Sequence, residues 1–258
     1  MRWQSFVTPR SCCRPPCLPK SIALALFVGS FIVALKYSTT RAALMPRLLC
    51  LHGKGETGAD FARRLEPIRS RCPGVELVCV DAPHALGGGF AWWHLPPGER
   101  SFTSSTFQGW DQTVSYIQDV WTKQGPFDGM LGFSQGAILL AALAALGLLG
   151  EKSVIQPRVL MLYGSAVPGP FKRELAARSA ALQADPGAHI SYRALHVLSK
   201  NDEVNPPEGA REVATAMGGQ VLEHSGGHEV PLDEASLAAY SAFLSAAAVA
   251  DHGHSEPV

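Results

Sequence analysis

The sequence predicts an α/β protein with a mostly parallel central sheet flanked by helices. Its short apolar runs, such as 129–133, are continuous instead of alternating with polar residues, which is typical of strands buried on both faces of a parallel sheet. Longer helical segments separate these runs along the chain. The 258 residues, 47% of them hydrophobic and 17% charged, are enough for one domain with a sizeable core.

Short runs rich in apolar residues are the predicted strands: 47–51, 76–80, 129–133, 159–163, 194–198 and 220–224. The predicted helices are the longer segments 58–68, 108–123, 135–149, 171–183, 207–217 and 232–247. Because right-handed crossovers join parallel strands, the loops after the carboxyl ends of the strands should meet at one edge of the sheet. Residues that are far apart in the sequence are therefore expected to converge there.

The first 44 residues form a leader that differs in composition from the rest. They carry six Lys or Arg, no Asp or Glu, and an apolar segment at 21–35. As a helix this segment rises about 22 Å, short of the roughly 30 Å of a bilayer core, so a full span is marginal and a signal-type apolar region fits better in length. Acid-free, arginine-bearing leaders are also typical of organelle transit peptides. The alternative is that translation starts at Met45, which predicts a cytoplasmic protein instead of an organelle-targeted or membrane-anchored one.

Residues 45–247 are expected to form the domain and 248–258 a flexible tail. Outside the leader the chain is net acidic, so no basic stripe is left to hold nucleic acid. The cysteines of the domain, Cys50, Cys72 and Cys79, show no metal-ligand spacing, and their odd number argues against a disulfide framework. We therefore expect no metal and no cofactor, and the sequence leaves the oligomeric state open.

The most informative motif is the segment 132–136, Gly-Phe-Ser-Gln-Gly, which lies between a predicted strand and a predicted helix. A strand that turns sharply into a helix around one residue strains that residue, and the positions two before and two after it must be small. Gly132 and Gly136 meet this need. The arrangement is typical of a nucleophile elbow and predicts Ser134 as the nucleophile.

A serine hydroxyl needs a base to take its proton and an acid to orient that base. His228 and Asp202 are the candidates, because each lies in a loop that follows a strand-like run. The chain order Ser, Asp, His is typical of the α/β-hydrolase fold and differs from the chymotrypsin and subtilisin orders. Glu203, next to Asp202, is the alternative acid.

Acyl transfer also needs backbone donors for the oxygen that becomes negative in the tetrahedral intermediate. The amide of Gln135 is the first candidate, because it lies at the start of a helix where N–H groups are unpaired. The amide of Lys54 is the second, because Gly53 and Gly55 on either side let the backbone approach a substrate closely. We interpret His52, before this loop, as a structural residue and not as a second base.

The connection 81–107 is rich in aromatic residues, which suit the wall of a pocket for an acyl or alkyl chain. Phe90, Trp92 and Trp93 are the predicted pocket residues, and core packing is the alternative for the two tryptophans. Only thirty residues separate Tyr163 from Ala194, and they include a predicted helix. A large lid domain is therefore not expected.

These features resemble the fungal and animal family of small serine hydrolases, the FSH family. The segments that carry the resemblance, in chain order, are Leu51-His52-Gly53, Asp81-Ala82-Pro83-His84, Trp92-Trp93, Gly125-Pro126-Phe127-Asp128-Gly129, Gly132-Phe133-Ser134-Gln135-Gly136-Ala137 and Gly227-His228-Glu229-Val230-Pro231. The resemblance covers about 45–244 and implies an α/β-hydrolase fold and a triad of Ser134, Asp202 and His228. It also favours Asp202 over Glu203. One local departure from the family's pattern is the polar segment 54–56, Lys-Gly-Glu, in the loop after His52-Gly53.

The predicted function is hydrolysis of carboxylic esters with small or acyl-chain groups, through an acyl-enzyme. The resemblance implies that some relatives act on thioesters, so an acyl thioesterase for carrier-protein or coenzyme A conjugates is the first alternative. A noncatalytic binding protein on the same fold is the second. The expected partners are a small-molecule ester or thioester, no nucleic acid, and a membrane if the segment 21–35 is an anchor.

Overall fold

The computed structural model describes residues 46–185 and 187–249. The predictions for the leader 1–44, including its apolar segment, lie outside the described residues, as does nearly all of the tail predicted at 248–258. Within the described ranges, no helix is long and apolar enough to cross a bilayer. Membrane association and cellular location therefore stay predictions.

One parallel sheet forms the centre of the described chain, with strand order β2-β1-β5-β6-β7-β8. Its strands are β1 (Arg47–Leu51), β2 (Glu76–Val80), β5 (Gly129–Phe133), β6 (Val159–Tyr163), β7 (Arg193–Ser199) and β8 (Gln220–His224). The predicted strands are confirmed, and β7 is one residue longer at each end. The winding direction reverses between β1 and β5, and ligands of open α/β sheets bind at such a switch point.

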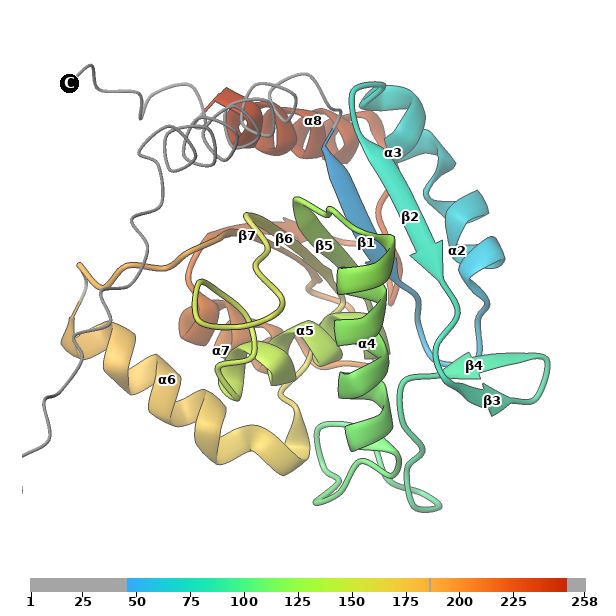
Figure 1. The fold of residues 1–258 in the computed structure, drawn as a ribbon, viewed down its shortest axis with the longest axis vertical. Helices are drawn as coiled ribbons and strands as arrows, with labels where there is room; N and C mark the ends of the chain where they lie inside the picture. The colour runs from blue at the N-terminus through green and yellow to red at the C-terminus, as the bar shows by residue number, and fades with distance from the viewer. Residues whose placement is uncertain (1–45, 186, 250–258) are drawn as a thin grey trace, which may run out of the picture. The chain divides into compact units, whose positions relative to one another are not determined.

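Helices cover both faces of the sheet (Figure 1). They are α2 (Gly58–Arg64), α3 (Glu66–Arg71), α4 (Trp110–Gln124), α5 (Gln135–Ala145), α6 (Lys172–Ala184), α7 (Pro207–Met217) and α8 (Glu234–Val249). Successive side chains of a strand point to opposite faces, and two buried clusters follow from this alternation. Leu49 and Met130 pack in the cluster with α4 to α7, while Cys50 and Leu131 pack in the cluster with α2, α3 and α8.

The helix predicted at 58–68 is instead two short helices. α2 ends at Arg64, Leu65 joins the two, and α3 begins at Glu66 with a proline in its first turn. Proline has no N–H to donate and disfavours a helical conformation in the residue before it. α5 also ends earlier than predicted, because Gly147 adopts a φ of 67° just beyond its last turn.

A β-hairpin lies within the connection that the sequence analysis treats as a loop. β3 (His84–Leu86) and β4 (Gly89–Ala91) pair in antiparallel fashion, and Gly87 in the turn has a φ of 60°. Adjacent glycines between two short apolar segments are a hairpin signal that the analysis did not use. On the other side of the sheet, the β6–β7 connection contains a 3₁₀ turn (Gly169–Phe171) and α6. Within the described residues, this connection is too short for a large lid domain, as the sequence predicts.

His196 on β7 is a buried histidine that should make stability depend on pH. Its Nε2 lies 2.9 Å from the Gly218 carbonyl and donates to it, while Nδ1 is buried without a partner among the described residues. Burial lowers the pKa of His196 from 6.5 to about 4. The unfolded chain therefore binds the proton more tightly than the folded protein. The contribution of His196 to the free energy of unfolding is fully present above pH 6.5 and is lost as the pH drops toward 4.

Replacing His196 with glutamine should reduce this acid sensitivity, because an amide donates to Gly218 but does not titrate. Between about pH 7 and pH 4.5, we expect the free energy of unfolding to fall by about 2 kcal/mol less in the variant than in the wild type. Urea unfolding of both proteins at both pH values measures the difference, and any general destabilisation by the substitution cancels. An equal fall in both proteins would contradict the role of His196.

Candidate active site

Ser134 lies at the sharp turn between β5 and α5. Its φ is 52° and its ψ is −116°. Among the described residues, Ser134 alone has a positive φ without being glycine, and this conformation costs free energy in an L-residue. Two backbone hydrogen bonds stabilise it: the Ser134 amide donates to Tyr163 O at 2.9 Å, and the Ser134 carbonyl accepts from Ile138 N at 2.9 Å. The turn projects the hydroxyl from the carboxyl edge of the sheet.

The glycines on either side of Ser134 allow three backbones to approach closely. A Cβ atom on Gly132 would lie 2.6 Å from the backbone carbon of Gly136, and one on Gly136 would lie 2.1 Å from Leu51 O. Both distances are shorter than real carbon contacts allow. The elbow therefore requires glycine at both positions, as the motif predicts.

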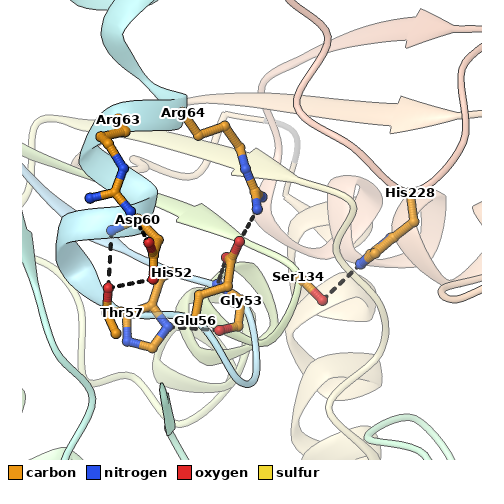
Figure 2. Close-up of polar contacts among 9 residues, drawn as sticks. All are labelled: His52, Gly53, Glu56, Thr57, Asp60, Arg63, Arg64, Ser134 and His228. Carbon is orange, nitrogen blue, oxygen red and sulfur yellow. Dashed lines mark hydrogen bonds and ion pairs between the residues drawn. The ribbon is translucent and has the colours of Figure 1, made fainter. Parts of the chain in front are cut away.

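Ser134, His228 and Asp202 are joined by hydrogen bonds. His228 Nε2 lies 2.8 Å from Ser134 Oγ, and His228 Nδ1 lies 2.7 Å from Asp202 Oδ2. Figure 2 shows the imidazole directed at the serine hydroxyl. The two loops that follow β7 and β8 supply the carboxylate and the imidazole. Glu203, the alternative acid, is exposed, and in the described chain the hydrogen bonds of His228 go to Asp202 and Ser134 instead.

The Asp202 carboxylate is stabilised in its ionised form. Its side chain is only 3% exposed, and Oδ1 accepts from the amides of Val204 at 2.9 Å and Asn205 at 2.8 Å. Burial by itself raises the pKa of Asp202, but the hydrogen bonds from His228, Asn205 and Val204 and the attraction to His228 outweigh it, so the pKa lies below its usual value. The carboxylate is thus charged and fixed in orientation.

Two residues that the sequence analysis did not select support His228 and Asp202. Gly164, after β6, has a φ of 55°, and a Cβ on it would lie 3.0 Å from His228 Cε1 and 3.5 Å from Asp202 Oδ2. The side-chain amide of Asn205 donates to Gly164 O at 2.7 Å. The position of Gly164 at the carboxyl end of a predicted strand was the available signal for it. The available sequence signal for Asn205 was its spacing of three residues from Asp202.

Gln135 and Lys54, whose amides are the predicted oxyanion donors, both line the cavity that contains Ser134. Neither amide has an acceptor among the described residues. The Gln135 side chain is buried and anchors the start of α5, because Oε1 accepts from Trp92 N at 2.8 Å and Nε2 donates to Trp93 O at 2.9 Å. Both amides therefore stay the predicted oxyanion donors.

Lys54 belongs to a tight turn at 53–56 that is attached to the hairpin. Glu56 N donates to Gly53 O at 3.3 Å, and Gly55 has a φ of 84°, which suits glycine at the third position of a turn. Gly55 N donates to Phe90 O at 2.7 Å, and Phe90 N donates to Glu56 O at 2.9 Å. The hairpin therefore fixes this turn, which lines the same cavity as Ser134.

His52 has the structural role that the sequence analysis gave it. It is fully buried, its Nδ1 donates to Gly53 O at 2.7 Å, and its Nε2 accepts from Ala82 N at 3.0 Å. Burial lowers the pKa of His52, in agreement with a neutral ring that donates on one side and accepts on the other. Its bonds hold the beginning of the turn 53–56.

The prediction that Phe90, Trp92 and Trp93 line the substrate pocket is wrong. Both tryptophans have an exposed fraction of 0%, and none of the three borders the cavity beside Ser134. Trp92 Nε1 donates to His52 O at 2.9 Å, and Trp93 stacks on Phe107 with ring centroids 4.0 Å apart. Large aromatic side chains gain most by complete burial, so the tryptophans form core beneath the site.

The cavity beside Ser134 has a volume of about 660 Å³. Its apolar lining consists of Leu95, Phe133, Ile138, Val204, Val230 and Leu232. Its charged lining consists of Lys54, Glu56, Arg64, Glu99, Arg100 and Glu229. The connection 81–107 therefore does contribute to the cavity, through Leu95 and the neighbouring segment 99–101, although its tryptophans do not.

Comparison with known proteins identifies the family of the chain. Residues 42–240 match the family model described as "Serine hydrolase (FSH1)". Esterase OVCA2 of Danio rerio is 30% identical over 233 residues, which cover 79% of this chain and 98% of the relative. Esterase OVCA2 of Mus musculus is 29% identical over 223 residues, which cover 77% and 95%.

Solved structures show the same fold at lower identity. The crystal structure of esterase PE8 aligns with a TM-score of 0.56 at 18% identity, over 79% of this chain and 93% of that one. Acyl-protein thioesterase 2 of Zea mays aligns with a TM-score of 0.55 at 20% identity, over 80% and 94%. The fold is that of the α/β-hydrolases. Together with the family match over most of its length, this shows that the chain belongs to the FSH1 family of serine hydrolases.

Proposed function

We propose that the protein hydrolyses carboxylic esters through a covalent acyl-enzyme on Ser134. The observation that carries the proposal is the unbroken chain of hydrogen bonds from Ser134 Oγ through His228 to Asp202, with distances of 2.8 and 2.7 Å. This is the geometry that lets an imidazole take the proton of a serine hydroxyl while a carboxylate holds the imidazole in the required tautomer. The names of the OVCA2 relatives support the same class of reaction.

The first half of the reaction acylates Ser134. As Oγ attacks the ester carbonyl carbon, His228 Nε2 takes the hydroxyl proton, and the positive imidazolium is stabilised by the ionised Asp202. The carbonyl oxygen becomes negative and accepts from the amides of Gln135 and Lys54. The tetrahedral intermediate then breaks its bond to the alcohol, and His228 returns the proton to the leaving oxygen.

The second half releases the acyl group. Water enters next to His228, gives up a proton to Nε2 and attacks the acyl carbon. The same two amides stabilise the second oxyanion, and collapse of this intermediate returns the proton to Ser134 Oγ. The products are an alcohol and a carboxylic acid, and the enzyme is regenerated without a metal or organic cofactor in any step.

The cavity supports a small substrate with an apolar portion. A volume of about 660 Å³ falls within the range of small-molecule sites, and its lining combines aliphatic side chains with charged ones. An acyl or alkyl chain of moderate length can contact Leu95, Ile138 and Val230 while the ester lies at Ser134. The charged lining favours a polar group at the other end of the substrate.

Acyl thioester hydrolysis is the alternative that uses the same residues, and the fold neighbour named acyl-protein thioesterase 2 favours keeping it. Matched oxygen and sulfur esters, graded by acyl-chain length, separate the two. We expect kcat/KM for the oxygen ester to equal or exceed that for the thioester of the same acyl group. A preference for the thioester of about tenfold or more, which corresponds to about 1.4 kcal/mol of transition-state binding, would instead identify a thioesterase.

A noncatalytic binding protein predicts a different result from the same panel. It would hydrolyse neither class of ester, and Ser134 would not react with a fluorophosphonate probe. The strained conformation of Ser134 argues against this alternative, because strain is retained where function needs it.

A further inference from the structure

A half-buried ion pair lies beside Ser134 and has no part in the mechanism described above. Glu56 comes from the turn after β1 and Arg64 is the last residue of α2, and both line the cavity that contains Ser134. Figure 2 shows the two side chains directed at one another. Their side chains are only 18% and 34% exposed, and Arg64 Nη2 donates to Glu56 Oε1. Charges that are removed from water to this extent cost desolvation free energy, so the pair calls for an explanation other than stability.

Glu56 uses its second oxygen to hold the backbone next to Lys54. Gly53 N donates to Glu56 Oε2 at 2.9 Å, so one carboxylate joins a guanidinium to a backbone amide. A Cβ on Gly53 would lie 3.1 Å from Glu56 Oε2 and 3.1 Å from Phe133 Cδ1. The chain at Gly53 is therefore enclosed between the carboxylate and the aromatic ring. The amide of Lys54, one residue further, is the one left without an acceptor.

Arg64 links this turn to the side of the site that contains the base. Its guanidinium carbon lies 4.9 Å from the centroid of the Phe133 ring, within the range of a cation–π contact. The Phe133 ring in turn lies 5.0 Å from the imidazole of His228, centroid to centroid. The position of Arg64 is fixed by α2, whose first turn is capped by Thr57 through a bond of 3.0 Å from Asp60 N.

From these contacts we infer that Glu56 and Arg64 are positioning residues for the oxyanion donor. Arg64 fixes the Glu56 carboxylate, and the carboxylate holds the Gly53 amide. The Gly53–Lys54 backbone is thereby oriented so that the Lys54 amide faces the substrate carbonyl oxygen, which becomes negative when Ser134 attacks. The inference rests on the proposed esterase function. Neither side chain needs to touch the substrate, and their effect is exerted through the Lys54 amide alone.

The substitutions Glu56→Ala, Glu56→Gln and Arg64→Met test the inference in steps. Glu56→Ala removes both contacts, and we expect kcat to fall by about 10- to 100-fold with KM changed by less than about twofold, since loss of an oxyanion donor itself costs about 10²- to 10³-fold. Glu56→Gln keeps an acceptor for Gly53 but loses the ion pair, and Arg64→Met loses the guanidinium. Each should lower kcat by about 3- to 10-fold. The double variant Glu56→Ala/Arg64→Met should be no slower than Glu56→Ala, because both act through one path.

Arg63→Met is the matched control. Arg63 neighbours Arg64 on the same helix and pairs with Asp60 at the surface, where the two side chains are 73% and 47% exposed. We expect its kcat to equal that of the wild type. A similar loss in Arg63→Met, or losses of kcat that only follow a smaller folded fraction in thermal unfolding, would overturn the inference.

Hydrogen exchange of the Gly53 amide gives a readout that does not depend on turnover. It should be faster in Glu56→Ala than in the wild type, and close to the wild-type rate in Glu56→Gln. If the wild type hydrolyses no ester, the proposed function fails, but the exchange result still decides whether Glu56 orders this backbone. Unchanged Gly53 exchange in Glu56→Ala would overturn the inference even if the protein is an active esterase.

Discussion

Replacing Ser134 with alanine is expected to lower kcat for ester hydrolysis by about 10⁴-fold or more and to abolish labelling by a fluorophosphonate probe. In the proposed mechanism the hydroxyl oxygen bonds to the acyl carbon, so without it only substrate binding and the backbone donors are left to act on the ester. Hydrolysis of an activated ester by purified protein, together with gel detection of the probe, measures both effects. Residual turnover near the wild-type rate would eliminate Ser134 as the nucleophile.

The fold should survive this substitution. Both backbone bonds of Ser134, to Tyr163 and from Ile138, are made by main-chain atoms, and alanine has the same Cβ in the strained turn. The side chain loses one hydrogen bond, to His228, which contributes about 1 kcal/mol. Ser101→Ala is the matched control, because Ser101 also lines the cavity but has no bond to His228 in the described chain. Its activity should remain at the wild-type level.

The strands and the hydrogen-bonded residues Ser134, His228 and Asp202 could be predicted because each has a signal in its local sequence. Buried parallel strands read as continuous apolar runs, and five of the six match the predicted bounds without change. Asp202 and His228 each lie in the loop that follows a strand, so topology alone brings them to one edge of the sheet. Gly132 and Gly136 gave a further local signal for the turn at Ser134. Neighbouring backbones lie so close to both positions that no side chain fits there.

The lining of the cavity could not be predicted, because it depends on which way side chains of one connection point. Trp92 and Leu95 are three residues apart, yet the tryptophan is in the core and the leucine borders the cavity. Composition identified the connection but not the direction of each side chain, which the hairpin determines. The Glu56–Arg64 pair was missed for a related reason. Its members belong to a turn and to the last residue of a helix, and no periodic pattern links the two positions.

Replacing Asp202 with asparagine should lower kcat by about 10⁴-fold while leaving the fold intact, because it changes the tautomer of His228. Oδ1 of Asp202 accepts from two backbone amides, Val204 N and Asn205 N. An asparagine at this position must keep its carbonyl oxygen there, so its NH₂ group faces His228 Nδ1. The imidazole then accepts at Nδ1 and carries its proton on Nε2, where it can no longer take the proton of Ser134.

Glu203→Gln provides the control for this change, since it removes the charge of the neighbouring carboxylate, which is exposed and has no hydrogen bond to His228 in the described chain. We expect its kcat to stay within about twofold of the wild type. If Glu203→Gln were the damaging substitution and Asp202→Asn the harmless one, the orienting acid would be Glu203. Because the backbone donors to residue 202 are the same in aspartate and asparagine, thermal unfolding should detect little difference between Asp202→Asn and the wild type. A large loss of stability would mean that the carboxylate acts mainly in folding, and the fall in kcat would then report unfolded protein instead of a wrong tautomer.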